Sequence, residues 1–298
     1  MTTPDPAAVT EWEAAGHHIT VDGRDVFVLD LPATGAESGP PVLVLHGFPS
    51  ASFDYRHILD RMRRGRRVLL FDFLGFGLSA KPDLRYSIEL QADVAEAVVA
   101  SAGVDRISLL THDMGDTVGG EILARDLDGA LGFSIERRAL TNGSIYIDMA
   151  QLSDGQNLLL SLPDERQDLV GADEGAAFKG GLAATFAPDR QPGADELDAQ
   201  WALMRRDRGA SLLPRTIRYI EDRRDRERRF TGAIEEHPSP LGVLWGRLDP
   251  IAVHPMTERL LEARPDTELV TLDDVGHYPM IEDPDRFADA ILGFLAIE

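Results

Sequence analysis

The chain has 298 residues, of which 43% are hydrophobic, and this size and composition suit one large globular domain with room for an inserted subdomain. Its formal net charge of −21 argues against binding to nucleic acid or anionic membranes, because both require a basic surface. There is no cysteine for thiol or disulfide chemistry, no apolar run long enough to span a membrane and no signal-peptide pattern at the amino terminus, so we expect a cytoplasmic protein.

The first half of the chain alternates predicted strands and helices. After a short helix near 9–15, segments 18–21 and 26–29 flank Asp22-Gly23, which is a hairpin signal. Continuous apolar runs at 42–45, 67–71 and 107–110 predict strands buried on both faces of a parallel sheet, and 138–141 predicts another. Helices are expected at 53–64, 88–102 and 114–126.

The pattern changes in the second half. Residues 147–237 show no clear strand and are interrupted by prolines, which predicts a mostly helical cap inserted between two core parts, 1–146 and 238–298. After 238 the alternation returns, with strands at 241–245 and 268–272 and helices at 256–263 and 284–296. This order predicts an α/β fold with a mainly parallel sheet covered on both faces, and ligands at the carboxyl ends of the strands.

Asp113 stands where a strand turns sharply into a helix, in the sequence Thr111-His112-Asp113-Met114-Gly115. Strand, turn and helix form the context of a nucleophile elbow, and a glycine two residues after the nucleophile leaves space for the tight turn. A carboxylate there can attack carbon and form a covalent ester. The alternative is an ordinary helix cap, for which aspartate is common. The stretch 109–116 alone does not decide between a nucleophile and a helix cap.

Two later residues complete a catalytic pattern. Asp249 follows the strand at 241–245, and His277 follows the strand at 268–272, so both emerge at strand ends. Alone, each would be read as a turn or loop residue. The order nucleophile, acid, histidine resembles that of the α/β-hydrolase fold, in which the oxyanion donors would be the N–H groups of Phe48 and Met114.

With these residues the sequence resembles the α/β-hydrolase family, in the branch of epoxide hydrolases and haloalkane dehalogenases that uses an aspartate nucleophile. The resemblance rests on His46-Gly47-Phe48-Pro49, on 72–82, on the elbow, on Leu248-Asp249-Pro250 and on Gly276-His277-Tyr278-Pro279. His112 through Asp116, Asn142-Gly143 and the run 212–229 further resemble the mesoderm-specific transcript family. The resemblance implies a mostly parallel eight-stranded sheet with helices on both faces and an inserted helical cap.

The resemblance also implies a substrate contact and a proton source. Tyr219 lies where an epoxide hydrolase carries a cap tyrosine, Tyr146 is the other candidate, and Asn142 could contact a leaving group. Met114 replaces the tryptophan that usually follows the nucleophile of haloalkane dehalogenases. Epoxide hydrolysis is therefore the first hypothesis. Haloalkane dehalogenation is the second, and a binding module with little turnover is the third.

The same resemblance sets the expected partners. The substrate would be a small, apolar electrophile that reacts with water, and no cofactor and no metal are implied. Neither nucleic acid nor membrane is expected as a partner, and the protein would be a monomer or a homodimer.

Overall fold

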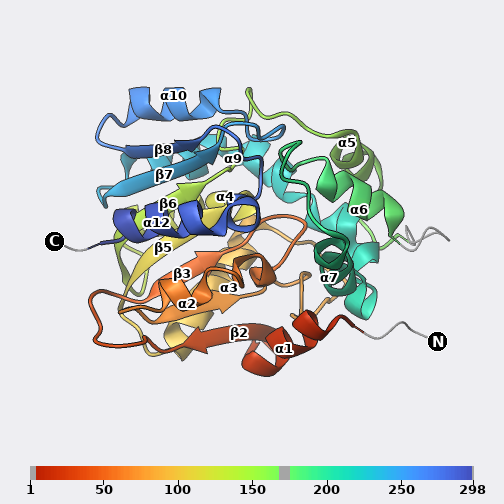
Figure 1. The fold of residues 1–298 in the computed structure, drawn as a ribbon, viewed down its shortest axis with the longest axis horizontal. Coiled ribbons are helices and arrows are strands. Elements are labelled where there is room, and N and C mark those ends of the chain that lie inside the picture. Colours follow the sequence, from red (N-terminus) through yellow and green to blue (C-terminus); the bar gives the residue numbers. More distant parts are fainter. Residues whose placement is uncertain (1–4, 168–174, 297–298) are drawn as a thin grey trace.

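One sheet runs through the whole molecule (Figure 1). A computed structural model describes residues 5–167 and 175–296 and gives the strand order β1-β2-β4-β3-β5-β6-β7-β8. β2 is antiparallel to β1 and to β4, and all other neighbours are parallel. The predicted mostly parallel, eight-stranded sheet is therefore confirmed. The strands are β1 (His17–Val21), β2 (Arg24–Leu31), β3 (Val42–Leu45), β4 (Val68–Phe71), β5 (Arg106–His112), β6 (Ser134–Thr141), β7 (Leu241–Gly246) and β8 (Glu268–Leu272).

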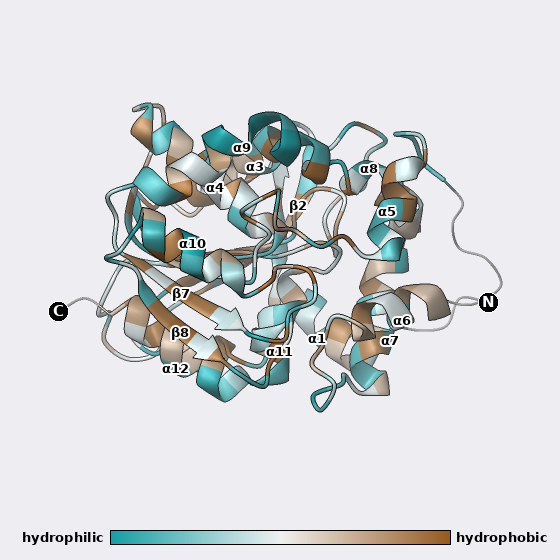
Figure 2. Ribbon diagram, turned by 90° about the horizontal axis from the view of Figure 1, so that it is seen from above, coloured by the Kyte–Doolittle hydropathy of each residue, from teal (hydrophilic) through white to brown (hydrophobic). Residues whose placement is uncertain are grey.

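Helices cover both faces of this sheet. Viewed along the sheet in Figure 2, α3, α4 and α9 lie on one side and α12 lies on the other. The helices are α1 (Ala7–Ala15), η1 (Ser52–Tyr55), α2 (Leu59–Met62), α3 (Ile88–Ser101), α4 (Met114–Leu127), α5 (Asp154–Ser161), α6 (Ala176–Ala183), α7 (Ala194–Arg205), η2 (Arg206–Leu212), α8 (Leu213–Thr216), α9 (Tyr219–Glu236), α10 (Pro255–Ala263), α11 (Pro279–Glu282) and α12 (Pro284–Phe294).

The local sequence explains the strands. Every side chain of β3 and β4 is buried, as continuous apolar runs in a doubly covered parallel sheet require. At the β1–β2 hairpin, Asp22 and Gly23 both have positive φ (48° and 74°), the conformation that the two-residue turn needs. The predicted hairpin is therefore confirmed.

One predicted helix is wrong. Residues 53–64 do not form a continuous helix but a 3-10 turn, η1, followed by the short α2. All four side chains of η1 are buried, including Asp54, whereas the exposed residues of the range come later, at His57, Asp60 and Arg64. The first turn therefore packs inside the molecule and lacks the polar face that a surface helix needs.

The described part of the range 147–237 contains helices and no strand. In Figure 1, α5, α6 and α7 form a layer beyond one end of the sheet, whereas α9 packs against α4 on a sheet face. A Cβ added at Gly120 of α4 would lie 2.7 Å from the carbonyl oxygen of Phe230 in α9, so glycine allows a close helix crossing. The last helix of the predicted cap range therefore covers the sheet.

Candidate active site

Asp113 occupies the turn between β5 and α4. Its backbone has φ 51° and ψ −113°, a conformation that costs a non-glycine residue about 1–3 kcal/mol and that clusters at functional sites. A Cβ added at Gly115 would lie 2.4 Å from the carbonyl oxygen of Leu45, so the turn can approach β3 only with glycine there. The Asp113 side chain makes no helix-capping hydrogen bond, which removes the ordinary explanation for aspartate at this place.

One backbone donor already holds the Asp113 carboxylate. The N–H of Phe48, in the loop after β3, donates to Asp113 Oδ2 at 2.8 Å. Gly47 allows this approach, since a Cβ there would stand 2.8 Å from the Cβ of Asp113. Met114 is the first residue of α4 and is buried beside the carboxylate; its role as a second donor stays a prediction.

His277 and Asp249 form a pair, as the sequence order predicts. His277 Nδ1 lies 2.7 Å from Asp249 Oδ2. Asp249 is buried and saturated with donors: Oδ1 accepts the N–H groups of Ile251 and Ala252, and Oδ2 also accepts the Asn142 amide at 2.7 Å. So many fixed donors leave the carboxylate one orientation, and that orientation fixes the histidine ring.

The electrostatics of His277 favour its protonated form in this state. Burial opposes the charge, but the charge and hydrogen bond of Asp249, together with the charge of Asp113, outweigh it and raise the pKa of His277 to about 9. His112 behaves in the opposite way, since burial, reinforced by the His277 charge, lowers its pKa to about 4. The neutral His112 ring is 2.8 Å from the backbone oxygen of His277, to which its Nε2–H donates.

Three predicted contact residues have different surroundings. Tyr219 is buried with its ring 5.7 Å from that of Phe48, and burial, followed by the charge of Asp113, raises its pKa. Tyr146 donates to Glu235 at 3.0 Å and does not line the cavity described below. Asn142 does not line it either: its amide supports Asp249, and its oxygen accepts the Gly246 N–H at 3.0 Å. Tyr219 is not among the lining residues either, but of the three it alone lies against Phe48 and has its pKa raised by the charge of Asp113.

Asp116 lies in the first turn of α4, directly behind the elbow. It is buried, accepts a hydrogen bond from the Thr111 hydroxyl, and its N–H donates to the Asp113 carbonyl at 3.0 Å. Burial, with the nearby Asp113 charge, raises the pKa of Asp116. A Cβ at Gly143 would lie 1.9 Å from Asp116 Oδ2. The glycine therefore makes room for the Asp116 side chain behind the elbow.

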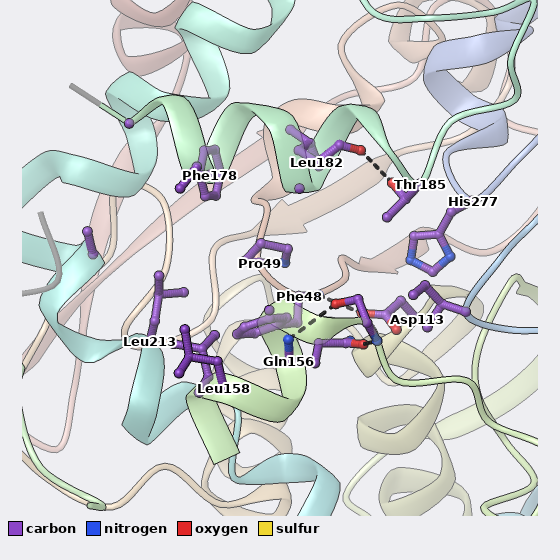
Figure 3. Close-up of a pocket in the computed structure, with 18 of the residues that line it drawn as sticks. Phe48, Pro49, Asp113, Gln156, Leu158, Phe178, Leu182, Thr185, Leu213 and His277 are labelled. Carbon is purple, nitrogen blue, oxygen red and sulfur yellow. Dashed lines mark hydrogen bonds between the residues drawn. The ribbon is translucent and has the colours of Figure 1, made fainter. Parts of the chain in front are cut away.

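A cavity of about 320 Å³, within the range of small-molecule sites, is lined by residues from the loops at the strand ends and from the layer of α5, α6 and α7. Figure 3 shows Asp113 and His277 at one end, with Leu158, Phe178 and Leu213 toward the other. The described residues that line it include no lysine or arginine. The lining comes from the loops after β3, β5, β7 and β8 and from the cap: Phe48, Pro49, Asp113, Ser153, Gly155, Gln156, Leu158, Leu159, Leu162, Gly175, Ala177, Phe178, Gly181, Leu182, Thr185, Trp201, Ala210, Leu213, Ile251, His277 and Tyr278.

The loop that carries His277 is joined directly to the cap. The His277 N–H donates to the carbonyl of Thr185 at 3.0 Å. Glu282 Oε2 accepts both the Gly276 N–H at 2.7 Å and the Ala187 N–H at 3.0 Å, so one carboxylate binds core loop and cap segment together. The sequence analysis missed this role of Glu282, and also Tyr278, which lines the cavity; the spacing of five residues between His277 and Glu282 was the available signal.

Over residues 5–167 and 175–296, no group of three or more side chains is arranged to hold a metal ion, and none of the helices there has the length and apolar character to cross a membrane.

Several known proteins are similar in sequence to this chain over most or part of its length. LipZ of Mycobacterium tuberculosis, which is named as a hydrolase, is 38% identical over 297 residues and covers 99% of both chains. The human mesoderm-specific transcript homolog protein is 34% identical over 296 residues, 97% of this chain and 88% of its own. A haloalkane dehalogenase of Agrobacterium fabrum is 30% identical over 148 residues, 47% of each chain.

The structural comparison gives the same fold. An alpha/beta hydrolase fold protein from Burkholderia ambifaria superposes with a TM-score of 0.75 at 22% identity, covering 93% of this chain and 97% of that one. The model of the alpha/beta hydrolase family matches residues 42–290, which include the elbow, the acid and the histidine. This chain therefore belongs to the alpha/beta hydrolase family.

Proposed function

We propose that this hydrolase attacks its substrate with the Asp113 carboxylate and opens epoxides to diols. The observation that carries the proposal is the elbow itself, where a carboxylate in a strained turn has one oxygen held by a backbone N–H beside a His–Asp pair. A serine there would favour ester cleavage through an acyl-enzyme. A carboxylate attacks a saturated electrophilic carbon and forms an alkyl ester.

In the first step, Oδ1 of Asp113 attacks a ring carbon while Oδ2 stays on the Phe48 N–H. The ring C–O bond breaks, and its oxygen needs a proton. Tyr219 is the proposed donor, because it is buried near Phe48 and its raised pKa keeps the phenol protonated at neutral pH. Tyr146, which is paired with Glu235, has weaker support for this role.

In the second step, water attacks the ester carbonyl with His277 as base. The negative oxygen that forms is the former Oδ2, already on the Phe48 N–H. Ester formation removes the Asp113 charge, which is one of the groups that raise the pKa of His277. The pKa therefore falls when the ester forms, and the neutral base becomes available in the intermediate that needs it.

The residues that line the cavity favour a neutral, apolar substrate. Its described lining is mostly leucine, alanine, glycine and aromatic side chains, with no lysine or arginine to pair with a substrate carboxylate, and the charge of His277 is already paired with Asp249. A charged substrate would have to leave water for this lining without a partner, which costs several kcal/mol in proteins.

Haloalkane dehalogenation is the second candidate. The Agrobacterium haloalkane dehalogenase shares sequence with this chain, and the apolar cavity suits a haloalkane. The same nucleophile and base would serve, but the departing halide would need donors in place of the tyrosine acid. A binding protein with little turnover is the third candidate, against which the assembled His277–Asp249 pair argues.

The test uses a His277→Gln variant, in which loss of the base should stall the second step. Intact-protein mass spectrometry after mixing with a panel of epoxides and haloalkanes should show a mass gain equal to a whole epoxide. A gain equal to an alkyl group without its halogen would instead establish the dehalogenase. The adduct must vanish when Asp113→Asn is added. His254→Gln, the same change at a histidine outside the cavity, should turn over without accumulating adduct.

A further inference from the structure

Three buried groups beside the cavity have no part in the mechanism above. They are Tyr278, which follows the base His277 and lines the cavity, Ser50 in the loop that carries Phe48, and Asp54 in η1. All three are at most 5% exposed. Buried groups that can carry protons and that reach a reaction cavity call for an explanation.

The three groups form a connected path. Tyr278 is the member at the cavity wall; burial raises the pKa of its phenol well above the usual value, and hydrogen bonding with the Ser50 side chain partly offsets this rise. The Ser50 hydroxyl also donates to Asp54 Oδ2. The charge of Asp113 is among the groups that raise the pKa of Tyr278, and Tyr278 and Asp113 line the same cavity, which places the phenol within reach of the reacting carboxylate.

The far end of the path is closed by the cap. Gln200 of α7 donates to Asp54 Oδ1 at 2.8 Å and to Glu196 at 3.0 Å. Because an amide NH₂ only donates there, Ser50 is the described hydrogen-bond partner through which Asp54 can exchange a proton toward the cavity. Asp54 itself is 0% exposed, so direct exchange with solvent is blocked.

We propose that Asp54 is an internal proton store for this active site, which delivers its proton through Ser50 to Tyr278, and that Tyr278 acts together with Tyr219 as proton donor to the oxygen leaving the substrate carbon. The inference rests on the proposed function, because a leaving alkoxide creates the demand for a proton. It makes Tyr278 a catalytic residue and gives Ser50 and Asp54 a supporting role through it.

The proton balance closes over one turnover. As the C–O bond breaks, the alkoxide takes the Tyr278 proton, the phenolate takes the Ser50 proton, and Ser50 takes the Asp54 proton, which leaves Asp54 as a carboxylate. Ester formation releases the proton that His277 carries at rest, and ester hydrolysis then consumes one water and returns one proton to His277. The proton released first reaches Asp54 from the cavity through Tyr278 and Ser50, and the sum is epoxide plus water to diol.

The surroundings of Asp54 keep it in the range where it can both hold and release a proton. Burial, only partly offset by the hydrogen bonds from Ser50 and Gln200, raises the pKa of Asp54 to about 7. Of the two charged groups that face it, Glu196 raises this pKa and Arg56 lowers it. A carboxyl that titrates near neutral pH is about half protonated there.

The kinetic test follows ester formation on Asp113 in the His277→Gln background, by rapid quench and mass spectrometry, from pH 5.5 to 9. With a terminal alkyl epoxide, the parent rate should fall as the pH rises through about 7. Adding Asp54→Asn should lower the rate at pH 6 at least about tenfold and flatten the profile, and Tyr278→Phe should cost about 10²-fold. The matched Glu196→Gln change should leave the rate at pH 6 within about twofold.

A bromoalkane of similar length separates proton supply from packing, since bromide leaves without a proton. The proposal would be overturned if Asp54→Asn slowed ester formation equally with the epoxide and with the bromoalkane. It would also be overturned if the pH profile for the epoxide did not change.

If the parent forms no adduct with any epoxide, the proposed function fails, and the relay is judged by infrared spectroscopy of the ligand-free protein. The carbonyl band of protonated Asp54, identified by its loss in Asp54→Asn, should shift in Ser50→Ala and in Tyr278→Phe. If Tyr278→Phe left the frequency of this band unchanged, the relay would be overturned.

Discussion

Replacing Asn142 by alanine should destabilise the fold, because its side chain makes four buried hydrogen bonds, of which the two shortest are 2.7 Å and 3.0 Å long. Its amide donates to the Asp249 carboxylate at 2.7 Å, a charged partner that contributes about 1.5–3 kcal/mol. Its oxygen accepts the Gly246 N–H at 3.0 Å, and leaving that buried donor unpaired costs about 1–3 kcal/mol. The φ of 44°, which asparagine tolerates better than alanine, adds to the loss. Even the lower limits sum to more than about 2 kcal/mol, and we expect about 3 kcal/mol.

Urea unfolding at pH 7.5, followed by tryptophan fluorescence, measures this loss. Asn157→Ala is the control, since Asn157 is the other asparagine of the chain and is exposed, and its variant should unfold within about 0.5 kcal/mol of the wild type. If Asn142→Ala behaved like the control, the two buried bonds could not carry the free energy assigned to them, and Asn142 would be free for the substrate contact that the sequence suggests.

Three further outcomes are expected. Asp113→Asn should lower the pKa of His277 from about 9 by about 1–2 units, because it removes an opposite charge; the NMR titration of the His277 ring measures this, and an unchanged value would contradict the coupling. Gly120→Ala should cost about 1–3 kcal/mol in thermal unfolding by forcing α4 and α9 apart, and a neutral result would contradict the close crossing. Tyr219→Phe should reduce epoxide turnover about 10²-fold while Tyr146→Phe leaves it nearly unchanged, and the reverse ranking would exchange their roles.

The fold was predictable wherever one signal dominated. Apolar runs too short for a helix identified β3, β4 and β5 as buried strands. The helix predicted for 53–64 is wrong because the apolar spacing there suits a surface helix, whereas all four side chains of η1, including Asp54, are buried. Helix α9 could be recognised as a helix, but its partner could not: Arg229 pairs with Glu121 of α4, a contact that no local pattern encodes.

In the candidate site, too, some residues could be predicted from the sequence and others depend on how the loops pack. Asp113, Asp249 and His277 could be nominated from their order along the chain, because each follows a strand and parallel strands end at one edge. Asn142 also follows a strand, yet its amide faces Asp249 because β6 and β7 are neighbours, which the sequence order alone does not specify. Tyr278 and Asp54 are far apart in sequence, and only the packing of their loops makes them one network.

The bonds from Thr185 and Glu282 to the His277 loop have a mechanical consequence. A cap segment whose backbone is bonded to the residue before the base, and to the base itself, moves with the base. Any motion that lifted residues 185–187 would also shift His277, so the enzyme would lose its base whenever that side opened. Substrate and product could therefore pass with the base in place only through a wall of the cavity other than the one to which Thr185 belongs.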